Sequence, residues 1–298
     1  MKNIKSKKTY EEQIEILRTR GCVIDDEGEC KRQLSRINYY RLSAYFIPYK
    51  NDADTYTVQI SFQKIVDTYE FDRKLRNILM LALEEVETNL RSKLAYYHAH
   101  KYGALGYMDP KTHTSERNKQ KAPYNHADFL KTFWSQVSAS KTNLIAQHHM
   151  EKYGGNFPLW VAVEFFPFGM LSRFFSNMIP SDRRAFAREN YFCHAESMES
   201  WLRCCTDLRN VCAHYGRLYY RIFPAIPRGV GVNHSSDPYA NRRLFPILLA
   251  LKNLHLDSER WNQEVLEPID ALIDRYGDSI TLWHIGFPTD WRNVLSSQ

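Results

Sequence analysis

The chain has 298 residues, of which 44% are hydrophobic, and its 40 basic and 34 acidic side chains give a formal net charge of +6. This composition excludes a disordered chain and suits one large or two small globular domains. The basic excess permits a polyanionic partner without requiring one. Because the sequence has neither a run of 18 apolar residues nor an apolar segment after its lysine-rich start, we expect no membrane span, no signal peptide and a cytoplasmic location.

The cysteines show no metal-binding pattern. They form no Cys-x2-Cys pair and no His–Cys set with zinc-ligand spacing, so we expect no metal site and a reducing compartment. The positions are Cys22, Cys30, Cys193, Cys204, Cys205 and Cys212.

The N-terminal segment predicts a helical pair. Thr9 can cap a short helix that ends at Gly21, and a second helix is expected from Cys30 to about Lys50, broken by Pro48. Basic side chains lie among tyrosines in this second helix, a mixture that suits stacking on unpaired RNA bases, although aromatic rings also fill helical cores. The candidate RNA-binding residues here are Tyr39, Tyr40 and Arg41.

A continuous helical pattern follows from Ser61 to about Tyr102. Its apolar residues recur at three, four or six positions, and neither Pro nor Gly interrupts them. Because this run is severalfold longer than the mean helix, we expect a break near Phe71 or Asp72. The recurring residues are Ile65, Tyr69, Leu75, Leu79, Leu83, Val86, Leu90 and Leu94.

The remainder of the chain also predicts helices, so the fold class is all-α. Residues 107–125 are polar and predict a surface loop whose basic residues are either solvated or in contact with RNA: Lys111, Arg117, Lys119 and Lys121. Helices are expected at 126–152, at 158–177 with Pro180 closing it, at 181–190 capped by Ser181 or Asp182, at 197 to about 221, and as two helices within 244–276 joined near Asp257.

The most informative stretch begins at Arg209-Asn210 and reaches His214. RNA cleavage without a metal needs a base, an acid and positive charge on the phosphorane. A histidine can supply the base or the acid, an arginine can grip two phosphate oxygens, and Asn210 can orient the phosphate or hold the His tautomer. These three residues are the candidate catalytic set, which needs no cofactor. The alternative is an Arg–Asn cap with a His packed in the core.

Helix geometry separates the two ends of this motif. Five residues rotate by about 140°, so Arg209 and His214 converge only near a helix end or where two copies of the motif meet. Beyond the motif, Arg217 and Arg221 are spaced to share one helix face, where they either track an RNA backbone or are simply exposed. Together with Tyr215, they complete the candidate RNA-binding residues.

A second candidate lies on the long helix. Glu87, Arg91 and His98 share roughly one face, and Arg91-x6-His98 repeats the Arg–His pairing. This set is either a second, internal half-site or a support in which Glu87 and Arg91 buttress the motif helix. Glu164 is expected to pair with Arg209 or Arg91, or to act as an acid.

The motif and several other blocks resemble a known family. Arg209-x4-His214 resembles the R-x4-6-H signature that opens a helix in the HEPN superfamily. Four further blocks, in the same order, are similar to those of the Abi-like proteins, the AbiD/AbiF type of abortive-infection factors. They are residues 38–45 (NYYRLSAY), residues 71–76 (FDRKLR), Glu87-x3-Arg91 with Tyr102-Gly103, and Pro158-x-Trp160 with Glu164 and Phe168-Gly169.

The resemblance implies a HEPN-type helical bundle with helical extensions at both ends. Residues 1–54 would be the N-terminal helical pair, 55–225 the catalytic core and 226–298 the C-terminal extension. The implied activity is metal-independent endoribonuclease cleavage that leaves a 2′,3′-cyclic phosphate. The implied partners are substrate RNA, a second copy whose motif completes a composite site, and an antitoxin, with a small structured RNA as one option. The alternative is a HEPN module that binds RNA or nucleotides without cleaving them.

Overall fold

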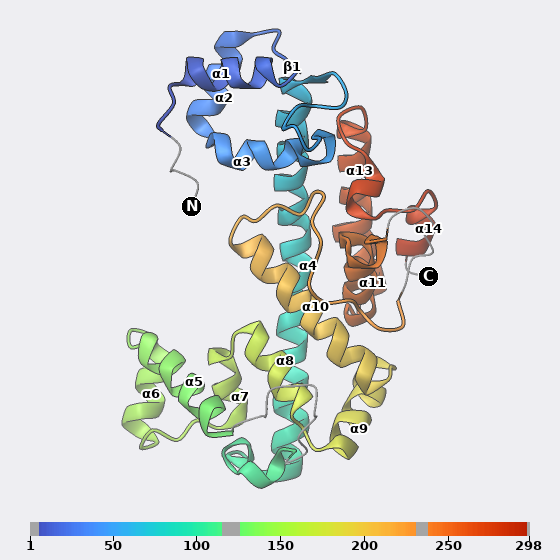
Figure 1. The fold of residues 1–298 in the computed structure, drawn as a ribbon. Coiled ribbons are helices and arrows are strands. Elements are labelled where there is room, and N and C mark those ends of the chain that lie inside the picture. Colours follow the sequence, from blue (N-terminus) through green and yellow to red (C-terminus); the bar gives the residue numbers. More distant parts are fainter. Residues whose placement is uncertain (1–5, 115–125, 231–237, 297–298) are drawn as a thin grey trace.

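The computed structural model describes residues 6–114, 126–230 and 238–296, and within them it confirms an all-α fold (Figure 1). The basic residues Arg117, Lys119 and Lys121, predicted for a surface loop, lie outside the described residues. The neighbouring segment forms two short 3₁₀ turns, η2 (Gly106–Met108) and η3 (Pro110–Thr112).

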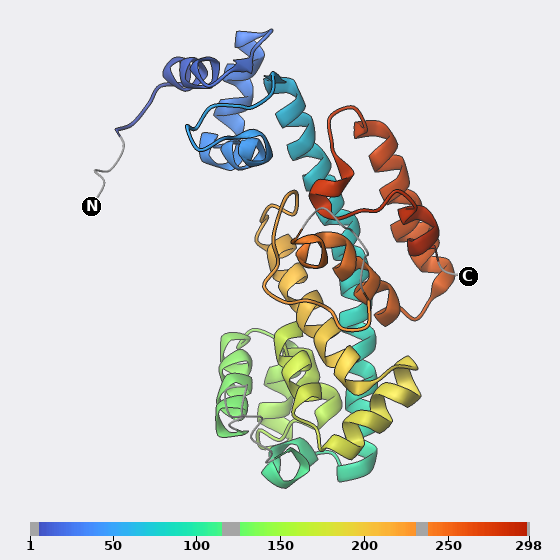
Figure 2. The same ribbon diagram turned by 45° about the vertical axis from the view of Figure 1, so that its right-hand side comes forward.

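Helix α4 (Phe62–Tyr102) is the spine of the molecule and extends through most of its height (Figures 1 and 2). The predicted break near Phe71 or Asp72 is wrong, because α4 is one helix of 41 residues, about 60 Å long at 1.5 Å per residue. Both residues are fully buried against neighbouring elements. Packing from several sides supports a helix length that average helix statistics do not favour.

The N-terminal unit is tied to the start of α4. Its elements are α1 (Tyr10–Thr19), β1 (Cys22–Val23), α2 (Glu27–Arg36), α3 (Tyr39–Ser43) and the 3₁₀ helix η1 (Ala44–Tyr49). Thr9 forms the predicted cap, with a reciprocal bond from its backbone N–H to Glu12. The helix predicted from Cys30 to about Lys50, with its break at Pro48, is wrong in its division. The break lies at Ile37, which is extended, the Asn38 side chain caps a new helix, and Pro48 lies inside η1. Strand β1 pairs in parallel with β2 (Ile60–Ser61).

The middle of the chain packs around the C-terminal half of α4. It contains α5 (His126–Ala139), α6 (Leu144–Lys152), α7 (Leu159–Ala162), the 3₁₀ turn η4 (Val163–Phe165), α8 (Phe168–Ser176) and α9 (Pro180–Tyr191). Two predicted helices are therefore divided, one where Asn143 caps α6 and one at Pro167. Pro180 begins α9 instead of closing the helix before it, since a proline fits the first helical turn.

The last helices cover the side of α4 and α10 (Ala195–Ala213) that faces away from α8 (Figures 1 and 2). They are η5 (Ala240–Arg242), α11 (Leu244–Leu254), α12 (Ser258–Trp261), the π-helical turn η6 (Asn262–Leu266), α13 (Glu267–Tyr276), η7 (Leu282–Ile285) and α14 (Trp291–Leu295). The predicted junction near Asp257 is confirmed, because the Asp257 side chain caps α12. Helix α11 packs on α10, and α13 packs on α4.

Candidate active site

The Arg209–His214 motif closes helix α10. The helix ends at Ala213, and His214 is its C-cap, with its N–H donating to the Asn210 carbonyl at 3.1 Å. The predictions that the motif opens a helix, and that this helix continues to about Arg221, are wrong. At a helix end the backbone changes direction, so a side chain there is not confined to the helix face that its sequence position implies.

Two residues stop the helix well before Arg221, where it was expected to end. Tyr215 adopts the left-handed region with φ of +55°, which ends the regular hydrogen-bond pattern. The Gly216 N–H then bonds back to the Val211 carbonyl at 2.7 Å. A Cβ on Gly216 would lie 3.0 Å from the Val211 side chain and 3.1 Å from its carbonyl oxygen, so this close return favours glycine.

The helix end presents the motif to solvent. Asn210, His214 and Tyr215 are exposed, and the Arg209 side chain is 34% exposed. Within the described residues, no hydrogen bond or ion pair joins Arg209 to His214. One copy of the chain therefore displays a histidine and a separate arginine at the same helix end.

A buried carboxylate holds the chain that follows the motif. Asp72 on α4 accepts hydrogen bonds from the backbone N–H groups of Leu218 and Tyr219, and from the Tyr45 hydroxyl at 2.7 Å. The Arg76 guanidinium donates to Asp72 at 2.5 Å and to the Gly216 carbonyl at 3.1 Å. Burial raises the pKa of Asp72, and Arg76 opposes that shift. This cluster fixes the segment directly after His214 against the spine.

Arg41 reaches the motif from the N-terminal unit. Its guanidinium donates to the Tyr215 carbonyl at 2.6 Å, across 174 residues of sequence. Tyr40 beside it is 75% exposed, whereas Tyr39 is half-buried and accepts a hydrogen bond from Arg20. Of the three residues predicted to bind RNA in this unit, Arg41 contacts the backbone directly after the motif, Tyr40 is exposed, and Tyr39 is half-buried.

The family model of the Abi-like proteins matches residues 32–220. The chain belongs to the Abi-like family. The matched segment begins within α2 and ends just after the backbone held by Asp72, so it includes Arg41 and the whole motif. Membership supports a role in abortive infection. No curated protein and no solved structure matches the chain.

In this Abi-like protein, a chain of ion pairs links the motif to α4. Glu87 lies 3.8 Å from Arg209 and accepts a hydrogen bond from Arg91 at 2.7 Å. Arg91 also lies 3.6 Å from Glu164 and donates to the Phe166 carbonyl at 3.0 Å. Burial raises the pKa of Glu87, and the two arginines oppose that shift. Glu87, itself bonded to Arg91, thus supports the motif arginine. The pairing of Glu164 with Arg91 agrees with one of the alternatives that the sequence left open.

His98 lies apart from these ion pairs. It is 1% exposed, its ring packs near Tyr102, His113 and Phe174, and neither ring nitrogen has a hydrogen-bond partner within the described residues. Burial lowers its pKa to about 4. A neutral, enclosed imidazole fits the core, so the structure favours the supporting interpretation of Glu87 and Arg91 over an internal half-site with His98.

Arg217 and Arg221 do not share a helix face, because they follow the end of α10. Arg217 is partly buried, its Nη1 has no partner within the described residues, and burial lowers its pKa. The Arg221 guanidinium lies over the Phe223 ring at 5.5 Å. Tyr215 is therefore more exposed than either of these two arginines.

The motif also contains a cysteine, Cys212. Cys212 is buried, and burial raises the pKa of its thiol to about 12, so it does not supply a thiolate nucleophile. Across the described residues, no group of three or more His, Cys, Asp or Glu side chains is arranged to hold a metal ion. In the same residues, no helix is both long enough and apolar enough to cross a bilayer.

Proposed function

We propose that this Abi-like protein is a metal-independent endoribonuclease of the HEPN type, with Arg209, Asn210 and His214 as its catalytic residues. The observation that carries the proposal is the display of His214 and Asn210 at an exposed helix end, beside an arginine held by Glu87. The histidine moves the proton of the 2′-hydroxyl or of the leaving 5′-oxygen, and the arginine neutralises phosphate charge. The products would be a 2′,3′-cyclic phosphate and a 5′-hydroxyl.

RNA cleavage in EDTA tests this proposal. The wild type and the variants Arg209→Ala and His214→Ala are first freed of bound nucleic acid at high salt. The controls are Arg203→Ala and His194→Ala, which alter exposed residues elsewhere on or beside α10. We expect the two motif variants to lose cleavage and the two controls to retain it. RNA binding by the wild type without cleavage would favour the alternative, a HEPN module that binds RNA without cutting it.

The composite site is part of the same proposal. Within the described residues of one copy, no hydrogen bond or ion pair joins Arg209 to His214, so we propose that a homodimer brings two motifs together. Mixing Arg209→Ala with His214→Ala protein would then restore part of the cleavage, because a mixed dimer holds one arginine and one histidine. Mixing wild type with excess of the double variant should lower activity. Full activity of a monomer in sedimentation would contradict the dimer.

We propose that the enzyme acts as a toxin-like antiviral effector that cuts cellular RNA and is restrained by an antitoxin, for which a small structured RNA is our candidate. The N-terminal unit supports this choice because Arg41 touches the motif backbone and Tyr40 is exposed next to it. RNA bound there would cover His214. The bound RNA should co-purify at low salt and dissociate as salt rises. Purified protein that carries no RNA and binds none at low salt would contradict the RNA antitoxin.

A further inference from the structure

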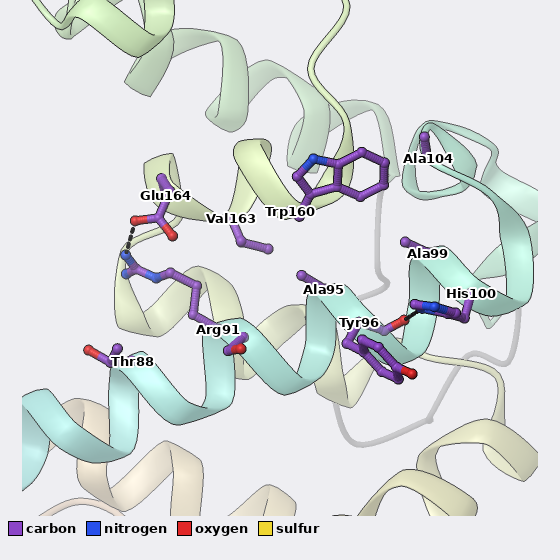
Figure 3. A pocket seen from close by; sticks show the side chains of 11 residues that line it. Thr88, Arg91, Ala95, Tyr96, Ala99, His100, Ala104, Trp160, Val163 and Glu164 are labelled. Atoms are coloured by element: carbon purple, nitrogen blue, oxygen red, sulfur yellow. Dashed lines mark hydrogen bonds and ion pairs between the residues drawn. The ribbon is translucent and has the colours of Figure 1, made fainter.

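A cavity of about 760 Å³ lies between α4 and the segment that contains α7 and η4 (Figure 3). This volume falls within the range of small-molecule sites, which is about 300–1,000 Å³. None of its lining residues belongs to the motif. The proposed catalytic residues therefore do not account for this cavity.

Small side chains create the space. Ala95 and Ala99 lie one turn apart on α4, and Ala104 follows the end of the helix (Figure 3). Elsewhere α4 buries large apolar residues such as Leu90 and Leu94. The alanines therefore leave a hollow on one face of an otherwise well-filled helix.

Aromatic side chains flank the hollow and remain accessible. Trp160 on α7 is 56% exposed, and Tyr96 on α4 is 68% exposed, with the His100 ring 3.9 Å from the tyrosine ring. In Figure 3, Trp160 lies on one side of Ala95 and Ala99, and Tyr96 and His100 lie on the other. Flat rings beside a floor of small residues match the shape of a stacked nucleobase.

The polar end of the cavity offers a carboxylate. Arg91 is engaged by both Glu87 and Glu164, so its charge is already compensated and is poorly placed to hold a phosphate. The Glu164 side chain is 52% exposed, and Figure 3 shows it at this end of the cavity. Such a group repels an anionic ligand and accepts hydrogen bonds from a base edge.

The same ion pairs connect the cavity to the motif. Glu87 bridges Arg91, which lines the cavity, to Arg209 in the motif. A strand of RNA that places a phosphate at Arg209 therefore has this cavity close by along α4.

We propose that the cavity is a subsite for one unpaired base of the substrate RNA, stacked on Trp160 with its hydrogen-bonding edge toward Glu164. This inference rests on the proposed ribonuclease function. Among the bases, guanine presents two adjacent donors, N1–H and the N2 amino group, which match the two oxygens of one carboxylate. The subsite therefore prefers guanine, and it sets which position of an RNA lies at the catalytic motif.

Binding of short single-stranded RNA tests the subsite without cleavage when all variants also carry His214→Ala. The probes are a labelled uridine oligonucleotide with one central guanosine and the same oligonucleotide with inosine, which lacks the N2 amino group. Trp160→Ala should weaken guanosine-probe binding about tenfold, equivalent to ~1.4 kcal/mol and within the range for stacking one base. Ala99→Leu should do the same by filling the hollow. Glu164→Gln should remove most of the preference for guanosine over inosine.

The matched control is Trp283→Ala, because Trp283 is 53% exposed and lies in η7, outside the cavity. Control-like affinity in both Trp160→Ala and Ala99→Leu would overturn the subsite. A change of oligomeric state in Ala99→Leu with unchanged RNA affinity would also overturn it and assign the cavity to a contact between copies.

The two proposals fail in different ways. Cleavage in EDTA by the His214-containing protein that Trp160→Ala and Ala99→Leu leave unchanged would overturn the subsite alone. Guanosine-dependent binding that these variants weaken, in a protein that never cleaves, would support the subsite and overturn the nuclease. A protein that binds neither probe at low salt would overturn both.

Discussion

Two parts of the chain carry an arginine followed by a histidine, and the fold gives them opposite environments. Arg209 and His214 lie where α10 ends, and the histidine faces solvent. Arg91 and His98 lie within α4, and the histidine is enclosed by aromatic rings with a pKa lowered to about 4. An Arg–His pair is therefore a candidate site only where the fold leaves the histidine exposed, as it does at the end of α10.

The largest expected effect is the difference between substituting His214 and substituting His98. Under the proposed function, His214→Ala should lower RNA cleavage by about 10²–10⁴-fold, because it removes the proton-transfer group. His98→Phe keeps the aromatic packing and should leave cleavage within a few-fold of wild type. Initial rates on a labelled RNA in EDTA measure both. Equal losses of cleavage rate in the two variants would contradict the distinction between the exposed and the buried histidine.

The next effect concerns the anchor behind the motif. Asp72→Ala leaves Arg76 buried without its carboxylate, and removing one partner of a buried pair costs about 3–5 kcal/mol. The control is Glu70→Ala, which breaks the more exposed pair with Arg73 on the same helix and should cost less than about 1 kcal/mol. Urea unfolding measures both free energies. A small loss in Asp72→Ala would show that the segment after His214 is held by other contacts.

The buried histidine should make stability depend on pH. The pKa of His98 is lowered from 6.5 to about 4, so the unfolded chain takes up its proton first as pH falls. Its contribution is therefore fully present above pH 6.5 and is lost as pH falls toward 4, by about 2 kcal/mol at pH 5. His98→Phe should remove this part of the stability loss. The pKa of His113 is also lowered to about 4, so the contribution of His113 to the loss should remain in the variant. Unfolding at pH 7 and pH 5 measures the difference, and an unchanged pH dependence in the variant would be inconsistent with a neutral buried imidazole.

The smallest effect concerns the contact between the N-terminal unit and the motif. Arg41→Ala removes the hydrogen bond to the Tyr215 carbonyl. Because the Arg41 side chain is exposed, we expect this loss to lower the free energy of unfolding by only about 1 kcal/mol. We expect cleavage to fall about fivefold, with Arg36→Ala, an exposed arginine on α2, as the control. A rise in activity in Arg41→Ala would instead indicate that the N-terminal unit restrains the motif.

Local sequence signals predicted the helices more reliably than the residues at which the helices begin and end. The apolar repeat from Ile65 to Leu94 correctly predicted the spine, since a long buried face leaves a periodic record. Its continuity through Asp72 was missed because that carboxylate is satisfied by residues more than a hundred positions away. The end of α10 was missed as well, although the Tyr215–Gly216 pair carried a signal in the glycine.

By itself, the sequence determined the all-α class, the helical pattern of residues 61–102, the Arg209–His214 motif and, through the order of its blocks, the Abi-like family. Side-chain periodicity and residue type are local properties, and they suffice for those conclusions. Only the tertiary structure decided which histidine is exposed, that Glu87 links Arg209 to Arg91, and that Arg41 and Asp72 hold the backbone after the motif. These depend on contacts between distant segments, whose burial and hydrogen bonds no local pattern records.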